Sequence, residues 1–271
     1  MGRPTRTIGT TRPPSPSASS APENKRTYMT INGYSSQWFK LFMPPPEEAS
    51  TSTDIAFLTR HLPLPRYRRL LDLCCGYGRH AVGMAEQGYQ VTGLDRDGEA
   101  IAEAQRRSRA AGVEVAYLTR DMREVGALRD TFDAVINMWQ SLSYFDDETN
   151  AGVLRAIHDR LTAGGRFVID LYNRASFERQ QGMKRQKING VTVESHGYMR
   201  GNRWHSELTY RDAKGAITGG DHMEWRLYTP DEFNSLAAAC GFATQLACAL
   251  WDESLVPSPD IGRMQIVLER E

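Results

Sequence analysis

The segment LLDLCCGYGRHA (70–81) places an apolar run directly before two closely spaced glycines and the start of a helical pattern. A strand–turn–helix unit of this kind directs free backbone N–H groups and the positive helix end toward a ligand above the turn. Glycine at Gly76 and Gly78 allows a ligand to approach the backbone closely. The next apolar segment (89–95) ends in Asp95, which is placed to accept two hydrogen bonds from a ribose diol. Together these features predict a nucleoside site at the carboxyl edge of a parallel sheet.

Apolar runs and helical segments alternate along the chain from residue 48 to residue 172. Short apolar runs predict strands, and segments with apolar residues on one side, several of them closed by glycine, predict helices. This alternation is typical of a parallel sheet covered by helices on both faces. The predicted strands are 69–75, 89–95, 113–119, 132–138 and 166–172, and the predicted helices are 48–62, 79–88, 98–112 and 147–165.

The pattern changes near residue 190, where period-two segments follow one another with only turns between them. Residues 190–228 therefore predict an antiparallel set of strands inserted into the α/β domain. A capping box at Thr229 and Glu232, with proline at the first helical position, predicts the start of another helix. Two final strands at 242–251 and 263–270 have no helix between them, so they predict an antiparallel pair.

The composition bears on several classes of partner. The 33 basic and 33 acidic residues cancel, so no overall charge draws the chain toward nucleic acid or an anionic membrane. The longest apolar runs fall far short of the roughly 20 residues that a membrane helix needs. The amino terminus carries no apolar export signal, so we expect a cytoplasmic protein. The four cysteines lack C-x-x-C spacing and the six histidines are scattered, so no metal site is expected.

An NAD(P)-dependent oxidoreductase is an alternative, because Gly76 and Gly78 also begin a loose G-x-G-x-x-A pattern. Asp72 argues against it, since a carboxylate just before the turn repels a pyrophosphate but can receive an ammonium group. Tyr210 and Lys214 have the Tyr-x-x-x-Lys spacing of some oxidoreductases. That pairing works only on a helix, whereas DAKG predicts a hairpin turn.

Taken in order, DLCCGYGRHA, VTGLD, RDMRE, FDAVINMWQSLSYF and GGRFVIDLYNR resemble the motifs of class I S-adenosylmethionine-dependent methyltransferases. The resemblance is nearest to bacterial small-molecule enzymes with D-x-C-C-G-x-G-R-H, a small antiparallel insert and an RLYTPDEF segment. It covers roughly residues 38–271 and implies an α/β, Rossmann-like sandwich. In that fold a mostly parallel sheet ends in a C-terminal antiparallel pair and carries a small antiparallel β insertion.

The expected organisation has three parts. Residues 1–28 are rich in Pro, Ser, Thr and Arg, which predicts a disordered tail. Residues 29–175 and 229–271 form the domain that binds S-adenosylmethionine, and residues 176–228 form the antiparallel insert, which we expect to cover the substrate.

The resemblance implies S-adenosylmethionine as the cofactor and assigns residues to its parts. For Arg96 and Arg123, a solvent-exposed surface arginine is the alternative. The cofactor residues it implies are Asp72 (ammonium group), Cys74, Gly76, Gly78 and Arg79 (glycine turn), Asp95 (ribose), Arg96, Asp121, Met122 and Arg123 (adenine), and Asn137 and Met138 (beside the sulfonium).

Methyl transfer is an in-line displacement, so the protein mainly supplies alignment, exclusion of water and in some cases a base. The Asn-Pro-Pro-Tyr or Asp-Pro-Pro-Tyr stretch used in nucleobase methylation is absent after 132–138, which indicates a small-molecule acceptor and no nucleic acid. An amine needs only deprotonation at neutral pH, whereas a hydroxyl needs a base. Tyr144 and His205 are the candidate bases.

The DHMEWRLY segment (221–228) alternates polar and apolar residues, so its polar face either roofs the site or meets solvent. A binding protein that retains the cofactor pocket without turnover is an alternative to the enzyme. The residues predicted to contact substrate are Trp38, Trp139, Ser141, Tyr144, Arg226 and Tyr228.

Overall fold

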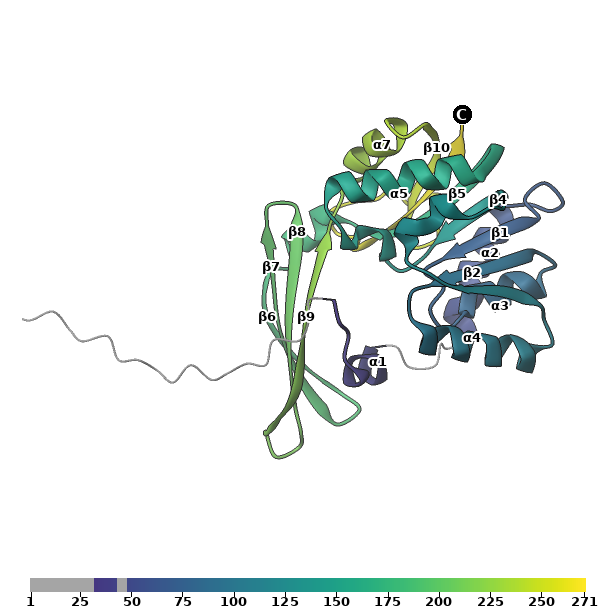
Figure 1. Ribbon diagram of the computed structural model, residues 1–271. Coiled ribbons are helices and arrows are strands. Elements are labelled where there is room, and N and C mark those ends of the chain that lie inside the picture. Colours follow the sequence, from purple (N-terminus) through teal and green to yellow (C-terminus); the bar gives the residue numbers. More distant parts are fainter. Residues whose placement is uncertain (1–31, 43–47) are drawn as a thin grey trace, which may run out of the picture.

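The computed structural model describes residues 32–42 and 48–271, and the predicted tail (1–28) lies outside the described residues (Figure 1). A seven-stranded sheet forms the centre, with five parallel strands and an antiparallel pair at one side. This arrangement confirms the predicted fold class. The strand order is β3 (Val115–Thr119), β2 (Gln90–Asp95), β1 (Arg69–Leu73), β4 (Phe132–Asn137), β5 (Leu161–Tyr172), β11 (Arg263–Arg270) and β10 (Phe242–Ala249).

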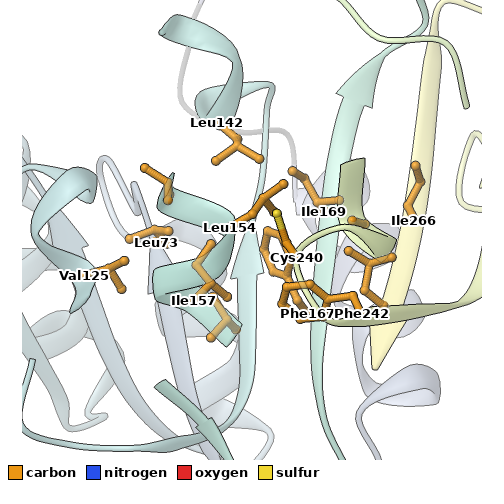
Figure 2. Close-up of a cluster of buried hydrophobic side chains, with 14 of the residues drawn as sticks. Leu73, Val125, Leu142, Leu154, Ile157, Phe167, Ile169, Cys240, Phe242 and Ile266 are labelled. Atoms are coloured by element: carbon orange, nitrogen blue, oxygen red, sulfur yellow. The ribbon is translucent and has the colours of Figure 1, made fainter. Parts of the chain in front are cut away.

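Helices cover both faces of this sheet. Leu154 and Ile157 of α5 pack toward Phe167 and Ile169 of β5 in a fully buried cluster (Figure 2). A second cluster lies under the helices of the opposite face. The first face carries α5 (Asp147–Arg160), α7 (Pro230–Ala238) and the 3-10 turn η1 (Met122–Ala127), and the second carries α2 (Glu48–His61), α3 (Arg79–Glu86) and α4 (Gly98–Ala111).

The predicted start of α7 is confirmed in detail. The Thr229 hydroxyl accepts a hydrogen bond from the Glu232 backbone N–H (3.3 Å), and the Glu232 carboxylate accepts one from the Thr229 N–H (3.0 Å). The predicted end of α5 is wrong. The helix stops at Arg160 because Leu161 is fully buried and pairs with Phe132 of β4, so the two glycines at 164 and 165 lie within β5.

Residues 174–226 form the short helix α6 (Arg174–Glu178) and a separate antiparallel sheet of four strands. The sequence predicted three of these strands but missed the first. Its sequence, GMKRQKI, is almost entirely exposed and has no apolar face to reveal it. The strands, in order, are β6 (Gly182–Ile188), β7 (Val191–Arg200), β8 (Arg203–Arg211) and β9 (Ile217–Arg226).

The Tyr-x-x-x-Lys spacing falls on this sheet and not on a helix, as predicted. Tyr210 is fully buried in β8, and Lys214 lies in the turn that follows, where its backbone N–H donates to the Asp212 carboxylate (2.9 Å).

One face of the four-stranded sheet is apolar and packs against α1 (Ser36–Phe42). Tyr210 and Met223 are buried there, and Trp38 of α1 packs on them. On the same face Trp225 contacts Tyr172 at the end of β5, with ring centroids 5.8 Å apart. The apolar face of the insert therefore faces the seven-stranded sheet, with α1 on that side (Figure 1).

Candidate active site

The glycine turn joins β1 to α3 in a strained, open conformation. Cys74, Gly76 and Gly78 all have positive φ angles, of 65°, 52° and 75°. A Cβ added to Gly76 would meet no atom within 4 Å, whereas a Cβ on Gly78 would lie 2.7 Å from the Tyr117 hydroxyl and 2.8 Å from Ala104. Gly78 is therefore required by packing, and Gly76 leaves the backbone open to a ligand.

Asp95 ends β2 directly beside this turn. One carboxylate oxygen accepts the N–H of Gly76 (2.9 Å), and the other accepts the N–H of Asp97 (3.0 Å). A carboxylate offers about four lone-pair sites, so acceptor capacity remains for a ribose diol. Arg96 follows as an exposed residue whose guanidinium reaches the carbonyl of Asn32 (3.4 Å).

Asp72 lies beneath the turn and is almost fully buried, at 1% exposure. Among the described residues, its Oδ2 has no hydrogen-bond partner. Burial, reinforced by the charge of Asp95, raises the pKa of Asp72 to about 7. A buried carboxylate with an unsatisfied oxygen fits a cationic ligand group, such as the ammonium of a methionine moiety.

The loop after β3 comes to the same edge, because the Arg120 N–H donates to the Asp95 carbonyl (2.9 Å). Asp121 caps η1 and accepts two hydrogen bonds from the guanidinium of Arg123 (2.9 and 2.8 Å). These bonds lower the pKa of Asp121. Met122 is buried beneath them. The structure thus brings the predicted adenine residues together, with Asp121 already engaged by Arg123.

Asn137 and Met138 end β4 in the interior. The Asn137 side chain donates to the Leu73 carbonyl (2.8 Å) and accepts the Leu142 N–H (3.0 Å), and the residue is fully buried. Its side-chain amide therefore fixes the loop after β4. Met138 is 4% exposed and belongs to the second core cluster.

The chain then turns sharply at Trp139 and Gln140, which have φ angles of 60° and 67°. Two successive non-glycine residues in the left-handed region are costly and must be held by their surroundings. The holding residue is Asp170, at the end of β5, whose carboxylate accepts the Trp139 N–H (3.1 Å) and whose carbonyl accepts the Gln140 N–H (3.0 Å). The result is a partly exposed Trp139 indole. The Ser141 hydroxyl turns back to the Met138 carbonyl (3.1 Å).

Arg79 packs on the ring of Trp139 and is itself held by Asp54. The guanidinium of Arg79 lies 5.1 Å from the Trp139 ring centroid, and it donates to the carboxylate of Asp54 on α2 (3.0 Å). Asp54 also bonds the buried His80 ring (3.0 Å).

Four aromatic residues meet above the sheet edge. The Trp225 indole N–H donates to the Tyr34 hydroxyl (3.1 Å), and the Tyr34 and Tyr144 hydroxyls share a hydrogen bond (2.9 Å). Trp38 packs on Tyr34, with ring centroids 4.6 Å apart. Burial raises the pKa of Tyr144 well above its ordinary value of 10. Sequence reasoning missed Tyr34, since its hydrogen-bond partners Tyr144 and Trp225 lie more than a hundred residues away in the chain.

Arg226 and Tyr228 lie away from these rings. Arg226 donates to the Asp147 carboxylate (2.7 Å) and lies 4.1 Å over the Tyr228 ring, whose hydroxyl accepts from Asn150 (3.0 Å). With residues of α7 they line a cavity of about 460 Å³ next to the amino end of α5. These contacts join the insert to α5 and give no support to the predicted role in substrate binding.

His205 also lies elsewhere. It pairs with Glu224 across β8 and β9, whereas Trp204 pairs with Trp225, so His205 and Trp225 lie on opposite faces of the sheet. Its ring stacks on Tyr198, with centroids 5.0 Å apart. The hypothesis of a base at His205 therefore finds no support in the geometry.

Over residues 32–42 and 48–271, the structure assembles no group of three or more His, Cys, Asp and Glu side chains suited to a metal ion. Within the same residues, no helix is both long and apolar enough to cross a membrane.

Comparison with known proteins bears on the class of this site. Residues 70–165 match the family described as "Methyltransferase domain". The chain is 33% identical over 111 residues to a ubiquinone biosynthesis O-methyltransferase of Xanthomonas axonopodis pv. citri (strain 306), an alignment that covers 41% of this chain and 45% of that protein. The chain spans less than half the length of the first curated relatives it matches.

Solved structures resemble nearly the whole fold. An S-adenosylmethionine-dependent methyltransferase from Clostridium acetobutylicum ATCC 824 superposes with a TM-score of 0.72 at 14% identity, covering 86% of this chain and 96% of that one. The sugar N-methyltransferase KedS8 from Streptoalloteichus sp ATCC 53650 has a TM-score of 0.64 at 22% identity, covering 97% and 100%.

The strand order, the open glycine turn and the domain match define a methyltransferase fold. Residues 70–165 match the methyltransferase domain, and the fold of the chain is that of solved S-adenosylmethionine-dependent methyltransferases. The motifs imply S-adenosylmethionine as the cofactor, and the unsatisfied Asp72 oxygen and the open space over Gly76 fit its methionine end.

Proposed function

We propose that this protein transfers a methyl group from S-adenosylmethionine to an amine of a small molecule. When bound, the cofactor supplies a methyl carbon already activated by positive sulfur. Asp95 would bind its ribose and Asp72 its ammonium group, and the aromatic residues above the sheet edge would hold the acceptor. We further propose that α1 and the insert (176–228) together cover the acceptor, since Tyr34 bonds Tyr144 and Trp225 of the insert bonds Tyr34.

The observation that carries the choice of an amine is the chemistry of the Tyr34–Tyr144–Trp225 group. Trp225 donates to Tyr34, and Tyr34 is the one hydrogen-bond partner of the Tyr144 hydroxyl within the described chain. A phenol oxygen has two lone pairs, so Tyr144 keeps at least one of them for an N–H donor. A bond of that kind would orient an amine for in-line attack.

The same wall supplies poor bases. Burial raises the pKa of Tyr144 far above neutrality and that of Tyr172 to about 12. His80 of α3, outside this wall, is no better a base, because burial lowers its pKa to about 4 and its ring bonds Asp54. A hydroxyl acceptor needs a base near neutral pKa, whereas an amine loses its proton to solvent. Aromatic rings also attract the positive charge of an ammonium group.

The comparisons support both acceptor classes. A sugar N-methyltransferase and a glycopeptide N-methyltransferase share the fold, which is consistent with an amine. The ubiquinone biosynthesis O-methyltransferases among the relatives make a hydroxyl the second candidate.

Pairs of amines and their hydroxyl analogues, such as an amino sugar and the parent sugar, test this proposal. Each pair is incubated with the protein and S-adenosylmethionine, and mass spectrometry detects the 14 Da gain of a methyl group. We expect methylation of amines, with kcat/KM rising with pH until the amine is fully deprotonated. Methylation confined to the hydroxyl members would contradict the choice of an amine.

A further inference from the structure

Arg263 is a partly buried cation on the acceptor side to which neither the motifs nor the family match give a role. It begins β11 directly opposite Tyr172, at the carboxyl end of β5. The fully buried Asp170 accepts hydrogen bonds from its Nε (3.2 Å) and its Nη2. The Gln265 amide also donates to Asp170 (2.8 Å), so the carboxylate is held firmly in place.

Asp170 binds one edge of the guanidinium and leaves the other edge available. Arginine has five N–H donors, and Asp170 takes one from Nε and one from Nη2. Within residues 32–42 and 48–271, Nη1 of Arg263 has no hydrogen-bond partner, and 26% of the side chain is exposed. The Nη1–Nη2 edge is the fork that matches a carboxylate.

Aromatic rings define where this edge lies. The Arg263 guanidinium is 4.7 Å from the Trp139 ring centroid and 5.8 Å from that of Tyr172. Tyr172 in turn contacts Trp225, which donates to Tyr34. Arg263 is thus continuous with the aromatic wall that would hold the acceptor.

The charge of Arg263 is incompletely compensated. Burial lowers the pKa of Arg263 to about 10. The nearby charge of Arg79 also lowers this pKa, whereas the charge of Asp54 raises it. Asp170 and Asp54 offset the formal charges of the two arginines. An anion would therefore be bound through short hydrogen bonds more than through a net positive field.

We propose that Arg263, oriented by Asp170 and flanked by Trp139, binds a carboxylate of the acceptor, so that the acceptor is an amine that also carries a carboxylate group. This inference rests on the proposed function. It assigns Arg263 to substrate specificity and leaves cofactor binding to the glycine turn and its aspartates.

Acetate is the probe that tests this subsite, with acetamide as its neutral analogue. Uniformly 15N-labelled protein saturated with S-adenosylhomocysteine is titrated while the indole resonances of its five tryptophans are followed. Comparison with Trp139→Phe identifies the Trp139 signal. We expect acetate to shift this signal saturably in the millimolar range. Acetamide, and sodium chloride at equal ionic strength, should leave it in place.

The decisive variant is Arg263→Gln, which we expect to weaken acetate binding at least tenfold. Arg263→Lys keeps the positive charge but loses the paired N–H donors of the guanidinium. Its acetate affinity should therefore lie between those of the wild type and Arg263→Gln. Arg166→Gln is the matched control, since Arg166 lies at the opposite end of the β5–β11 pair, bonds Glu269 (3.0 Å) and stacks on Tyr67. It should change the acetate affinity less than twofold. If acetate and acetamide shift the Trp139 signal of the wild-type protein equally, the proposal is overturned. This outcome does not depend on any variant.

Arg263 could bind the carboxylate of the acceptor or that of the cofactor, and the affinity for S-adenosylhomocysteine distinguishes the two. If Arg263 serves the acceptor, Arg263→Gln binds S-adenosylhomocysteine as tightly as wild type. A tenfold loss, with the affinity for 5′-methylthioadenosine unchanged, would assign Arg263 to the cofactor's own carboxylate and overturn the proposal. Acetate binding by a protein that fails to bind S-adenosylhomocysteine would count against the proposed function alone.

Discussion

At the scale of single residues, two aspartates with opposite surroundings lie at the proposed cofactor edge. Asp95 already accepts two backbone N–H groups and is partly exposed, whereas Asp72 is buried with one oxygen unsatisfied. The first is suited to uncharged hydroxyl donors, and the second to a cation that satisfies both its charge and its free oxygen.

The first prediction concerns Asp95→Asn. It should weaken binding of S-adenosylhomocysteine about tenfold or more, because a charge-assisted hydrogen bond contributes about 1.5–3 kcal/mol. Isothermal calorimetry measures the change. Asp97→Asn is the control, since Asp97 caps α4 two residues away and points its carboxylate at Glu99 and Ala100. Equal affinities for wild type and Asp95→Asn would remove the assigned ribose role.

The second prediction concerns pH. Between the ordinary carboxyl pKa of 3.8 and about 7, Asp72 holds a proton in the folded protein that the unfolded chain has lost. The folded state binds more protons, so this group lowers the free energy of unfolding as pH rises through that window. An ammonium ligand favours the ionised carboxylate, so the affinity for S-adenosylhomocysteine should rise from pH 6 to pH 8.

Calorimetry at several pH values checks this trend. Asp72→Asn should bind more weakly at pH 8 and lose most of the pH dependence. Asp95→Asn should keep a pH dependence that is shifted to lower pH, because the charge of Asp95 helps to raise the pKa of Asp72. Affinity that falls with rising pH would show that Asp72 does not receive the ammonium group.

At the scale of secondary-structure elements, a buried carboxylate adds to the apolar packing that attaches α1 to the insert. Asp221 of β9 accepts the N–H and the hydroxyl of Ser35 (both 2.7 Å) and the hydroxyl of Tyr210 (2.5 Å). The Ser35 hydroxyl in turn accepts the N–H of Trp38. Because Tyr34 precedes this anchor, Asp221 fixes where the Tyr34 hydroxyl meets Tyr144.

The third prediction is that Asp221→Ala releases α1 and leaves the cofactor edge intact. Amide exchange should accelerate over residues 32–42, and KM for the acceptor should rise more than the dissociation constant of S-adenosylhomocysteine. Asp212→Ala, in the exposed turn after β8, is the control and should change neither. Unaltered exchange over residues 32–42 would show that α1 is held by other contacts.

The fourth prediction concerns the junction between the insert and α5. Tyr228→Phe removes the hydrogen bond from Asn150 and should cost about 1 kcal/mol of unfolding free energy. Thermal unfolding measures the loss, and S-adenosylhomocysteine affinity should stay at the wild-type value. A variant of normal stability with impaired methyl transfer would restore the substrate role predicted from the sequence.

Prediction of helices and strands from the sequence is correct where the pattern involves residues that are neighbours in the chain. The capping box at Thr229 and the apolar strands of the central sheet depend on neighbours in the chain, and both are present. Strand β6 was missed because its stability comes from pairing with β7, since its own side chains are exposed. The end of α5 was misplaced because burial of Leu161 against β4 outweighs the glycine signal.

At the scale of the whole molecule, the proposed acceptor side is built from segments far apart in the chain. Tyr34, Trp139, Tyr172, Trp225 and Arg263 come from five different segments and meet only after both sheets have formed. The glycine turn and Asp95 follow from one strand–turn–helix unit and its neighbour, so the sequence predicts them. The position of the proposed acceptor residues depends on how the insert and α1 pack against the central sheet. Hydrophobic patterns in the sequence do not specify that packing.

The central claim is that this edge of the sheet transfers a methyl group to an amine. The most direct measurement uses S-adenosylmethionine labelled with 13C in its methyl group, incubated with the protein and a mixture of small amines, and followed by NMR. The account predicts that the sulfonium methyl signal declines while N-methyl signals appear in equal amount. It also predicts that Tyr144→Phe slows this methyl transfer. A protein that binds S-adenosylmethionine while the label stays on sulfur in every mixture would contradict the claim and indicate a binding protein without turnover.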